Sequence, residues 1–206
     1  MSPQSVSTND APQDTARWAA ALFQSRQTIL PKRLAAPGPD ADQLLSILGA
    51  AASAPDHGQL LPWRFVRVPI EQRARLAEVF SQSLLERDCQ ATSEQVAQAR
   101  EKAYRSPVLL LTIVDGACGD PAIDLYERIL SAGCAVQNML LMATALGFGS
   151  ALTSGQALKA QPLRNLFELS PGEHALCFIS VGTVQSRKPS RLRPAVSDYV
   201  DVLAPA

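Results

Sequence analysis

The sequence predicts an α+β domain in which a central sheet of four to five strands, mixed or antiparallel, is flanked by helices. Four segments have strand character, namely residues 64–69, 107–114, 148–152 and 175–184. They alternate with longer segments whose apolar residues recur at helical spacing. The second segment contains the continuous apolar run VLLLTIV, which is typical of a strand covered on both faces. A length of 206 residues is that of one domain.

Helical periodicity predicts five helices and one shorter helical stretch. These cover residues 15–28, 40–52, 70–87, 92–104, 122–146 and 161–167. Asp40 is a favourable N-cap for the second helix, and Gly147 is a favourable C′ residue after the long fifth one. The helices 70–87 and 92–104 carry charges at positions such as Arg73 and are expected on the surface.

The two ends of the chain have a different character from its middle. Residues 1–16 are polar, contain Pro3 and Pro12, and lack the apolar stretch of a signal peptide. We therefore expect a mobile N-terminal extension before a single domain over residues 17–206. That domain includes a basic tail at 185–206, which has few core residues and is expected to extend onto a partner subunit. With no signal peptide and four scattered cysteines, a cytoplasmic location is expected.

Residues 129–148 form a twenty-residue stretch without a charge, close to the length that spans a membrane. Ser131, Gln137, Asn138 and Thr144 interrupt this stretch, and no basic cluster flanks it. A buried helix at the centre of a water-soluble domain explains it better. No membrane association is expected.

Composition excludes several classes of function. Lys+Arg and Asp+Glu both number 19, so the chain lacks the basic excess typical of nucleic-acid binding, and a few placed cations must recognise any bound anion. Two histidines and scattered cysteines predict no metal site. The sequence contains none of the motifs GxSxG, HExxH and GxxxxGK[ST]. We therefore assign the chemistry to a bound cofactor.

Four segments lie in the order and spacing of the nitroreductase family, and the chain resembles its small branch over roughly residues 17–200. They are SRQT (25–28), APDHGQLLPWRF (54–65), SAGCAVQNMLLMATALGFGSALTSG (131–155) and HALCFISVGTV (174–184). The resemblance implies a homodimer that holds FMN at its subunit interface. It also implies ping-pong transfer of hydride from NADH or NADPH to the flavin, and then to a nitroaromatic, quinone or related small-molecule acceptor. The sequence does not select between the two nucleotides.

The resemblance places Arg26, Gln27 and Thr28 at the family's Arg-x-Ser element, which contacts the flavin phosphate and ribityl chain. A phosphate is well matched by an arginine and hydroxyl donors. Arg191 matches a C-terminal cation that reaches the phosphate, and Lys188 and Arg193 are weaker matches. Without the resemblance, these cations would be interpreted as a solvated helix end and a solubilising tail.

His57 matches a position beside the flavin, on the loop before the Pro-Trp strand. A turn histidine bonded to local backbone is an equal alternative. Leu61 occupies a position where relatives carry Gln or Asn, so either Gln59 replaces that contact or the contact is lost.

Leu152, Thr153 and Ser154 match the segment whose backbone lies along the flavin ring in relatives. Close relatives carry a Trp-Arg pair where this chain has Leu152-Thr153, so a cation near the ring is gone. Leu61, Leu152 and Thr153 favour an alternative within the fold, a non-catalytic flavin-binding or interaction dimer. A flavin dehydrogenase acting on a biosynthetic intermediate is a third alternative.

Overall fold

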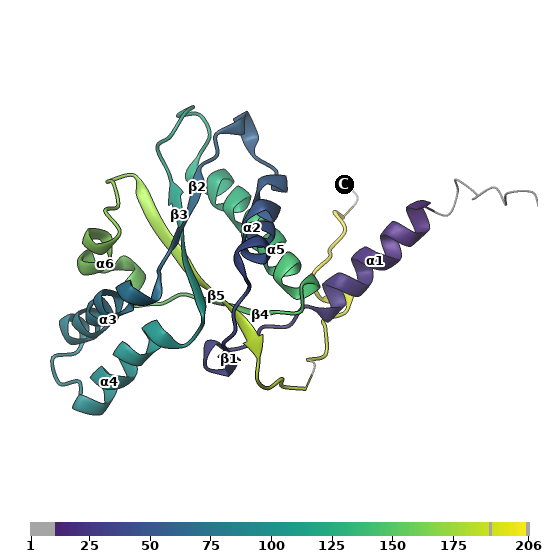
Figure 1. Cartoon of the computed structure of the whole chain (residues 1–206). Helices are drawn as coiled ribbons and strands as arrows, with labels where there is room; N and C mark the ends of the chain where they lie inside the picture. Colours follow the sequence, from purple (N-terminus) through teal and green to yellow (C-terminus); the bar gives the residue numbers. More distant parts are fainter. Residues whose placement is uncertain (1–10, 190, 205–206) are drawn as a thin grey trace, which may run out of the picture.

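The computed structural model describes residues 11–189 and 191–204. Its centre is a five-stranded sheet in which all strand pairings are antiparallel (Figure 1). The strands are β1 (Leu34–Ala35), β2 (Trp63–Arg67), β3 (Val108–Asp115), β4 (Gly149–Thr153) and β5 (Glu173–Val184). Their order is β1-β5-β3-β2, and β4 also pairs with β5. The predicted α+β class is confirmed. The strand β5 pairs with three others, β1, β3 and β4.

The described part of the chain has six α-helices. They are α1 (Ala11–Ser25), α2 (Ala41–Gly49), α3 (Arg73–Arg87), α4 (Ser93–Glu101), α5 (Leu125–Ala145) and α6 (Gln161–Leu166). Of these, α1 packs against α5 and extends away from the sheet (Figure 1). Local chemistry sets their ends. Asp40 caps α2 through a capping box with Gln43, and Asp124 accepts hydrogen bonds from the first turn of α5. Gly147 follows α5 with a φ of 86°, which confirms its prediction as the C′ residue.

The core lies on both faces of β3, as the apolar run predicted. Val108 and Leu110 belong to a cluster with α2 and α5, whereas Leu109 and Leu111 belong to a cluster with α3 and α6. This alternation follows from the period of two along a strand. The long uncharged segment becomes α5, which packs against the sheet. Among the described residues, no helix is long and apolar enough to cross a membrane.

The first helix differs from its prediction. It begins at Ala11 rather than near Thr15, since Pro12 is tolerated in a first turn where its missing N–H has no helical partner. Residues 11–16 of the expected extension are therefore helical, and residues 1–10 lie outside the described part. The helix ends at Ser25, so Arg26 to Thr28 leave it. A two-residue strand, β1, was not predicted because so short a segment has no periodicity.

Arg73 was expected on the surface and is instead 1% exposed. Its guanidinium donates to the carbonyl oxygens of Val68 at 2.8 Å and Ala103 at 2.6 Å, and more weakly to that of Pro107 at 3.4 Å. Burial lowers the pKa of Arg73 from its usual value. The side chain fixes the start of α3 to the segments on either side of it.

Candidate functional site

The segment after α1 runs beside β4 and brings the predicted Arg-x-Thr element to the sheet. Thr28 forms a parallel bridge with Ser150, and the backbone N–H of Ile29 donates to the Ser150 carbonyl at 2.9 Å. Thr28 is therefore held by backbone pairing with β4, whereas the backbone N–H of Arg26 still donates to the Leu22 carbonyl of α1 at 3.2 Å.

Arg26 and Thr28 line a cavity of about 200 Å³ together with Leu152. These three predicted site residues are far apart in sequence, and the fold brings them together. The cavity is completed by Ser150 and Ala151 of β4 and by Gln137 and Leu140 of α5. Gln27, between the two polar residues, is half-buried and does not line this cavity.

Ser150 was not assigned a role from the sequence. Its side chain is 1% exposed, and its Oγ has no hydrogen-bond partner among the described residues. A buried hydroxyl without a partner is costly, so such a group is rare without a ligand or water. Together, Arg26, Thr28 and Ser150 offer one cation and two hydroxyl groups, which suit a ligand with phosphate and hydroxyl oxygens. In the sequence, Ser150 is one of two hydroxyl residues in the short strand GSALT, and nothing distinguishes it there as a site residue.

Thr153 and Ser154 line a different cavity of about 620 Å³, on the side of α3 and α4. Leu152 lies on the small cavity, so the end of β4 separates the two spaces. Leu152 is 45% exposed, and Thr153 and Ser154 are also exposed. The predicted segment 152–154 is therefore accessible from both cavities.

His57 and Leu61 line neither cavity. His57 Nδ1 lies 2.7 Å from Glu127 Oε2, at the start of α5. The Leu61 N–H donates to Asp56 Oδ2 at 2.7 Å, and the Leu61 side chain is 64% exposed with a φ of 47°. Gln59 is also exposed. Within one chain, this loop is thus not assembled with the Arg26 cavity.

The basic tail returns toward the end of α1 (Figure 1). Arg193 donates from Nη2 to the Arg26 carbonyl at 2.9 Å. Arg191 and Lys188 are exposed in the tail. The structure thus places Arg193, the weaker match from the sequence, beside the Arg26 segment.

Comparison with known proteins decides the family. The sequence model of the Nitroreductase family matches residues 24–183, which include nearly all of the predicted site. The chain belongs to the nitroreductase family. The Escherichia coli (strain K12) protein YdjA, which is named as an NAD(P)H nitroreductase, is 33% identical over 153 residues, covering 74% of this chain and 82% of YdjA.

Solved structures of the nitroreductase family have the same fold. A nitroreductase-like family protein from Bacillus cereus superposes with a TM-score of 0.75 at 16% identity, covering 98% of both chains. A nitroreductase with bound FMN from Desulfitobacterium hafniense superposes with a TM-score of 0.65 at 18% identity, covering 90% of this chain and 97% of the other. The resemblance first recognised in four sequence segments is confirmed, and with it the expected fold.

Proposed function

We propose that this protein is an FMN-dependent oxidoreductase that transfers hydride from NADH or NADPH to nitroaromatic, quinone or related acceptors by a ping-pong mechanism. The observation that carries the proposal is the small cavity in which Arg26 and Thr28 lie beside the unpartnered Ser150 hydroxyl. The family, the name of YdjA and the FMN in the Desulfitobacterium hafniense structure support the same activity.

The residues of the small cavity fit the polar end of FMN. Arg26 matches the phosphate in charge, and the Thr28 and Ser150 hydroxyls can donate to phosphate or ribityl oxygens. Gln27 continues the same segment. Arg191 and Arg193 of the tail add positive charge, and the contact of Arg193 with the Arg26 carbonyl keeps the tail close to this end.

The segment Leu152–Ser154 borders the flavin ring in this proposal. Bound FMN supplies a ring that accepts hydride from the nucleotide and gives it to the acceptor. The chain orients that ring through backbone groups of the segment, and a backbone donor tolerates changes of side chain. Leu152, Thr153 and Ser154 themselves bring no charged side chain to the segment that borders the ring.

A homodimer completes the site, because His57 and Leu61 lie apart from the Arg26 cavity within one chain. Large apolar side chains are exposed on α1, α5 and the tail. They include Trp18, Phe23, Tyr126, Leu130, Leu192, Val202 and Leu203. Apolar surface on this scale marks an interaction site, and a two-fold interface would cover it on both copies. The partner's loop before β2 would then approach the flavin. The unpaired cysteines are consistent with a reducing cytoplasm.

The visible spectrum tests this proposal. The purified protein is expected to show flavin absorption bands, alone or after addition of FMN, and to lose them when NADH or NADPH is added without oxygen. A protein that never acquires flavin bands contradicts the proposal. Bands that persist with both nucleotides would support the alternative, a non-catalytic flavin-binding dimer, which the apolar residues Leu61 and Leu152 favour.

A further inference from the structure

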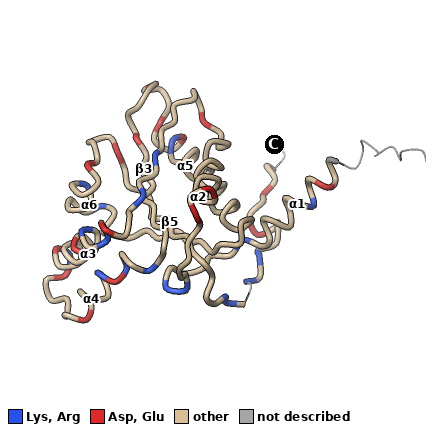
Figure 2. Tube along the Cα trace, viewed as in Figure 1, with Lys and Arg blue, Asp and Glu red and all other residues tan. Residues whose placement is uncertain are grey.

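The larger cavity of about 620 Å³ has an unusual charge composition. Four basic side chains line it, and none of its lining residues is acidic. The chain as a whole has 19 basic and 19 acidic residues, so this is a local concentration of one sign. The four residues are Lys32, Arg87, Lys102 and Arg105. They come from three parts of the chain: the turn before β1, the end of α3, and the 3-10 turn after α4 with the residue that follows it. Figure 2 marks the Lys and Arg positions along the trace in blue.

Three of these cations keep their charge uncompensated. Arg105 donates from Nε to Glu101 Oε2 at 2.6 Å, and that pair is neutral. No carboxylate of the described residues forms an ion pair with Lys32, Arg87 or Lys102. Basic side chains around a concave, partly apolar space focus a positive potential into it and attract anions. The positive potential of this cavity is therefore available to a ligand.

The cavity also has an apolar wall. Phe80, Leu84, Leu109 and Phe178 line it alongside the polar side chains Gln95 and Gln98. A volume of about 620 Å³ lies within the usual range for pockets that hold a small organic molecule. The lining thus suits a ligand with a flat or apolar body and an anionic substituent.

The position of the cavity connects it with the flavin. Thr153, Ser154 and Gly155 form part of its lining, and the first two belong to the segment that borders the flavin ring in the proposed function. We infer that this cavity binds the anionic group of a substrate that exchanges hydride with the flavin, with Lys32, Arg87 and Lys102 as the residues that select it. This inference rests on the proposed function. The anion could be an acceptor's carboxylate or a phosphate of the nucleotide donor, which share this chemistry.

Kinetics with a matched pair of acceptors tests the inference. 4-Nitrobenzoate and 4-nitrobenzamide have the same ring and differ in charge. With the flavin-loaded protein and NADH, we expect the lower KM for the acid. In the double variant Arg87→Gln and Lys102→Gln, KM for the acid should rise about tenfold, which is the lower end of what a hydrogen bond to a charged group contributes. KM for the amide should rise less than twofold, because the amide carries no charge. Arg75→Gln is the matched control, since Arg75 is exposed on α3 and does not line the cavity.

The donor is tested in the same way. A rise in KM for NADH or NADPH in the double variant, with the acid and amide unaffected, would assign the site to the nucleotide phosphates. The inference would be overturned if the double variant changed KM for the acid and the amide equally and left KM for both nucleotides unchanged. Lys32→Gln, on a different element, repeats the test should the double variant fold poorly.

Calorimetry separates this inference from the proposed function. Binding of 4-nitrobenzoate in the absence of NAD(P)H requires no turnover. A protein that binds the acid more tightly than the amide but never reduces flavin would contradict the proposed function and leave the anion site standing. A protein that reduces flavin but binds both compounds equally, and whose KM for both nucleotides is unchanged in the double variant, would contradict the anion site alone.

Discussion

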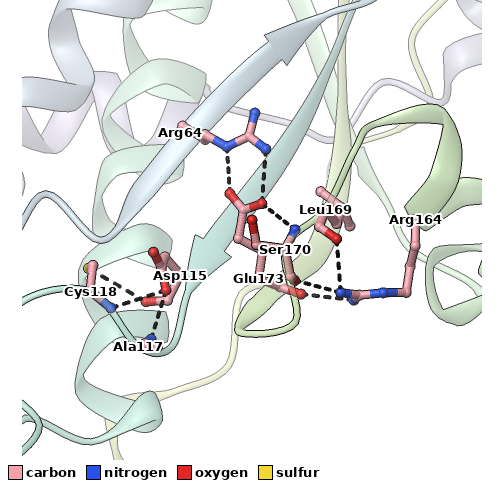
Figure 3. A network of polar contacts seen from close by, with 8 residues as sticks. All are labelled: Arg64, Asp115, Ala117, Cys118, Arg164, Leu169, Ser170 and Glu173. Atoms are coloured by element: carbon pink, nitrogen blue, oxygen red, sulfur yellow. Dashed lines mark hydrogen bonds and ion pairs between the residues drawn. The ribbon is translucent and has the colours of Figure 1, made fainter.

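Arg64 of β2 and Glu173 of β5 form a two-point ion pair across the strand β3 that lies between them (Figure 3). Arg64 donates from Nε to Oε1 at 2.7 Å and from Nη2 to Oε2 at 3.2 Å. Glu173 Oε2 also accepts the backbone N–H of Ser170 at 2.9 Å, and Arg164 donates to the Glu173 carbonyl at 2.9 Å. The start of β5 is therefore tied both to the far strand and to the loop after α6.

Glu173→Gln should destabilise the fold by about 1 kcal/mol, less than a fully buried charged hydrogen bond contributes, because solvent screens the exposed Arg64. The Glu173 side chain is 11% exposed and that of Arg64 is 46% exposed. Urea unfolding at neutral pH measures the change. The matched control is Glu71→Gln, on an exposed residue, which should have almost no effect. Equal stability of both variants would show that the pair contributes nothing.

The same pair predicts a pH dependence. The hydrogen bond from Arg64 lowers the pKa of Glu173 below its usual value, and the Ser170 backbone N–H acts in the same direction. Because the folded pKa lies below the unfolded one, ionised Glu173 stabilises the fold above the unfolded pKa, and this contribution is lost as pH falls through the folded pKa. The stability difference between wild type and Glu173→Gln should therefore be constant near neutral pH and shrink below about pH 4.3. A stability difference that grew on acidification would contradict this prediction, because it would require a folded-state pKa of Glu173 above the unfolded one.

Arg26→Ala should weaken FMN binding by about 1.5–3 kcal/mol, the contribution of a hydrogen bond to a charged group. Fluorescence titration of the flavin-free protein with FMN measures the change. Lys159→Ala is the control, since Lys159 is an exposed cation that does not line the small cavity. Unchanged affinity in Arg26→Ala would remove this residue from the phosphate site.

Ser150→Ala should change stability and FMN affinity in opposite directions. Without flavin, it removes a buried hydroxyl that has no partner among the described residues, so stability should stay equal or rise by up to about 1 kcal/mol. With flavin, a hydrogen bond is lost and FMN affinity should fall. Ser106→Ala is the control, because its buried Oγ donates to the Val108 carbonyl at 2.9 Å, and its loss should only destabilise. Full FMN affinity in Ser150→Ala would mean that its hydroxyl does not face the flavin.

The sequence predicted the fold where the signal was local. The caps at Asp40 and Gly147 and the apolar run of β3 are set by neighbours in sequence, and the structure has them as expected. Arg73 could not be predicted, because its acceptors lie in segments before and after α3 that only the tertiary fold brings to it. For the same reason, the sequence could not predict that Ser150 is buried without a hydrogen-bond partner beside Thr28, since these two residues are 122 positions apart in the chain.

The dimer is the part of the proposed site that one chain does not contain, and Gly133 offers a direct test of it. Gly133 is exposed on α5, and a Cβ built there meets nothing within 4 Å in its own chain. Tyr126 and Leu130 precede it at helical spacing, and they are 81% and 69% exposed. Gly133→Arg should therefore be tolerated by the single chain, where replacing glycine in a helix contributes about 1 kcal/mol of stability, but should obstruct a partner.

We expect the wild-type protein to sediment as a dimer, and Gly133→Arg to sediment as a folded monomer with weakened FMN binding. Ala97→Arg is the matched control. Ala97 is also an exposed small residue of a helix, but it lies on α4, which packs against α3 on the other side of the sheet from α5. It should remain a dimer with full FMN affinity. A wild-type monomer that binds FMN tightly would contradict the interfacial site, because His57 and Leu61 would then have no route to the cavity that contains Arg26.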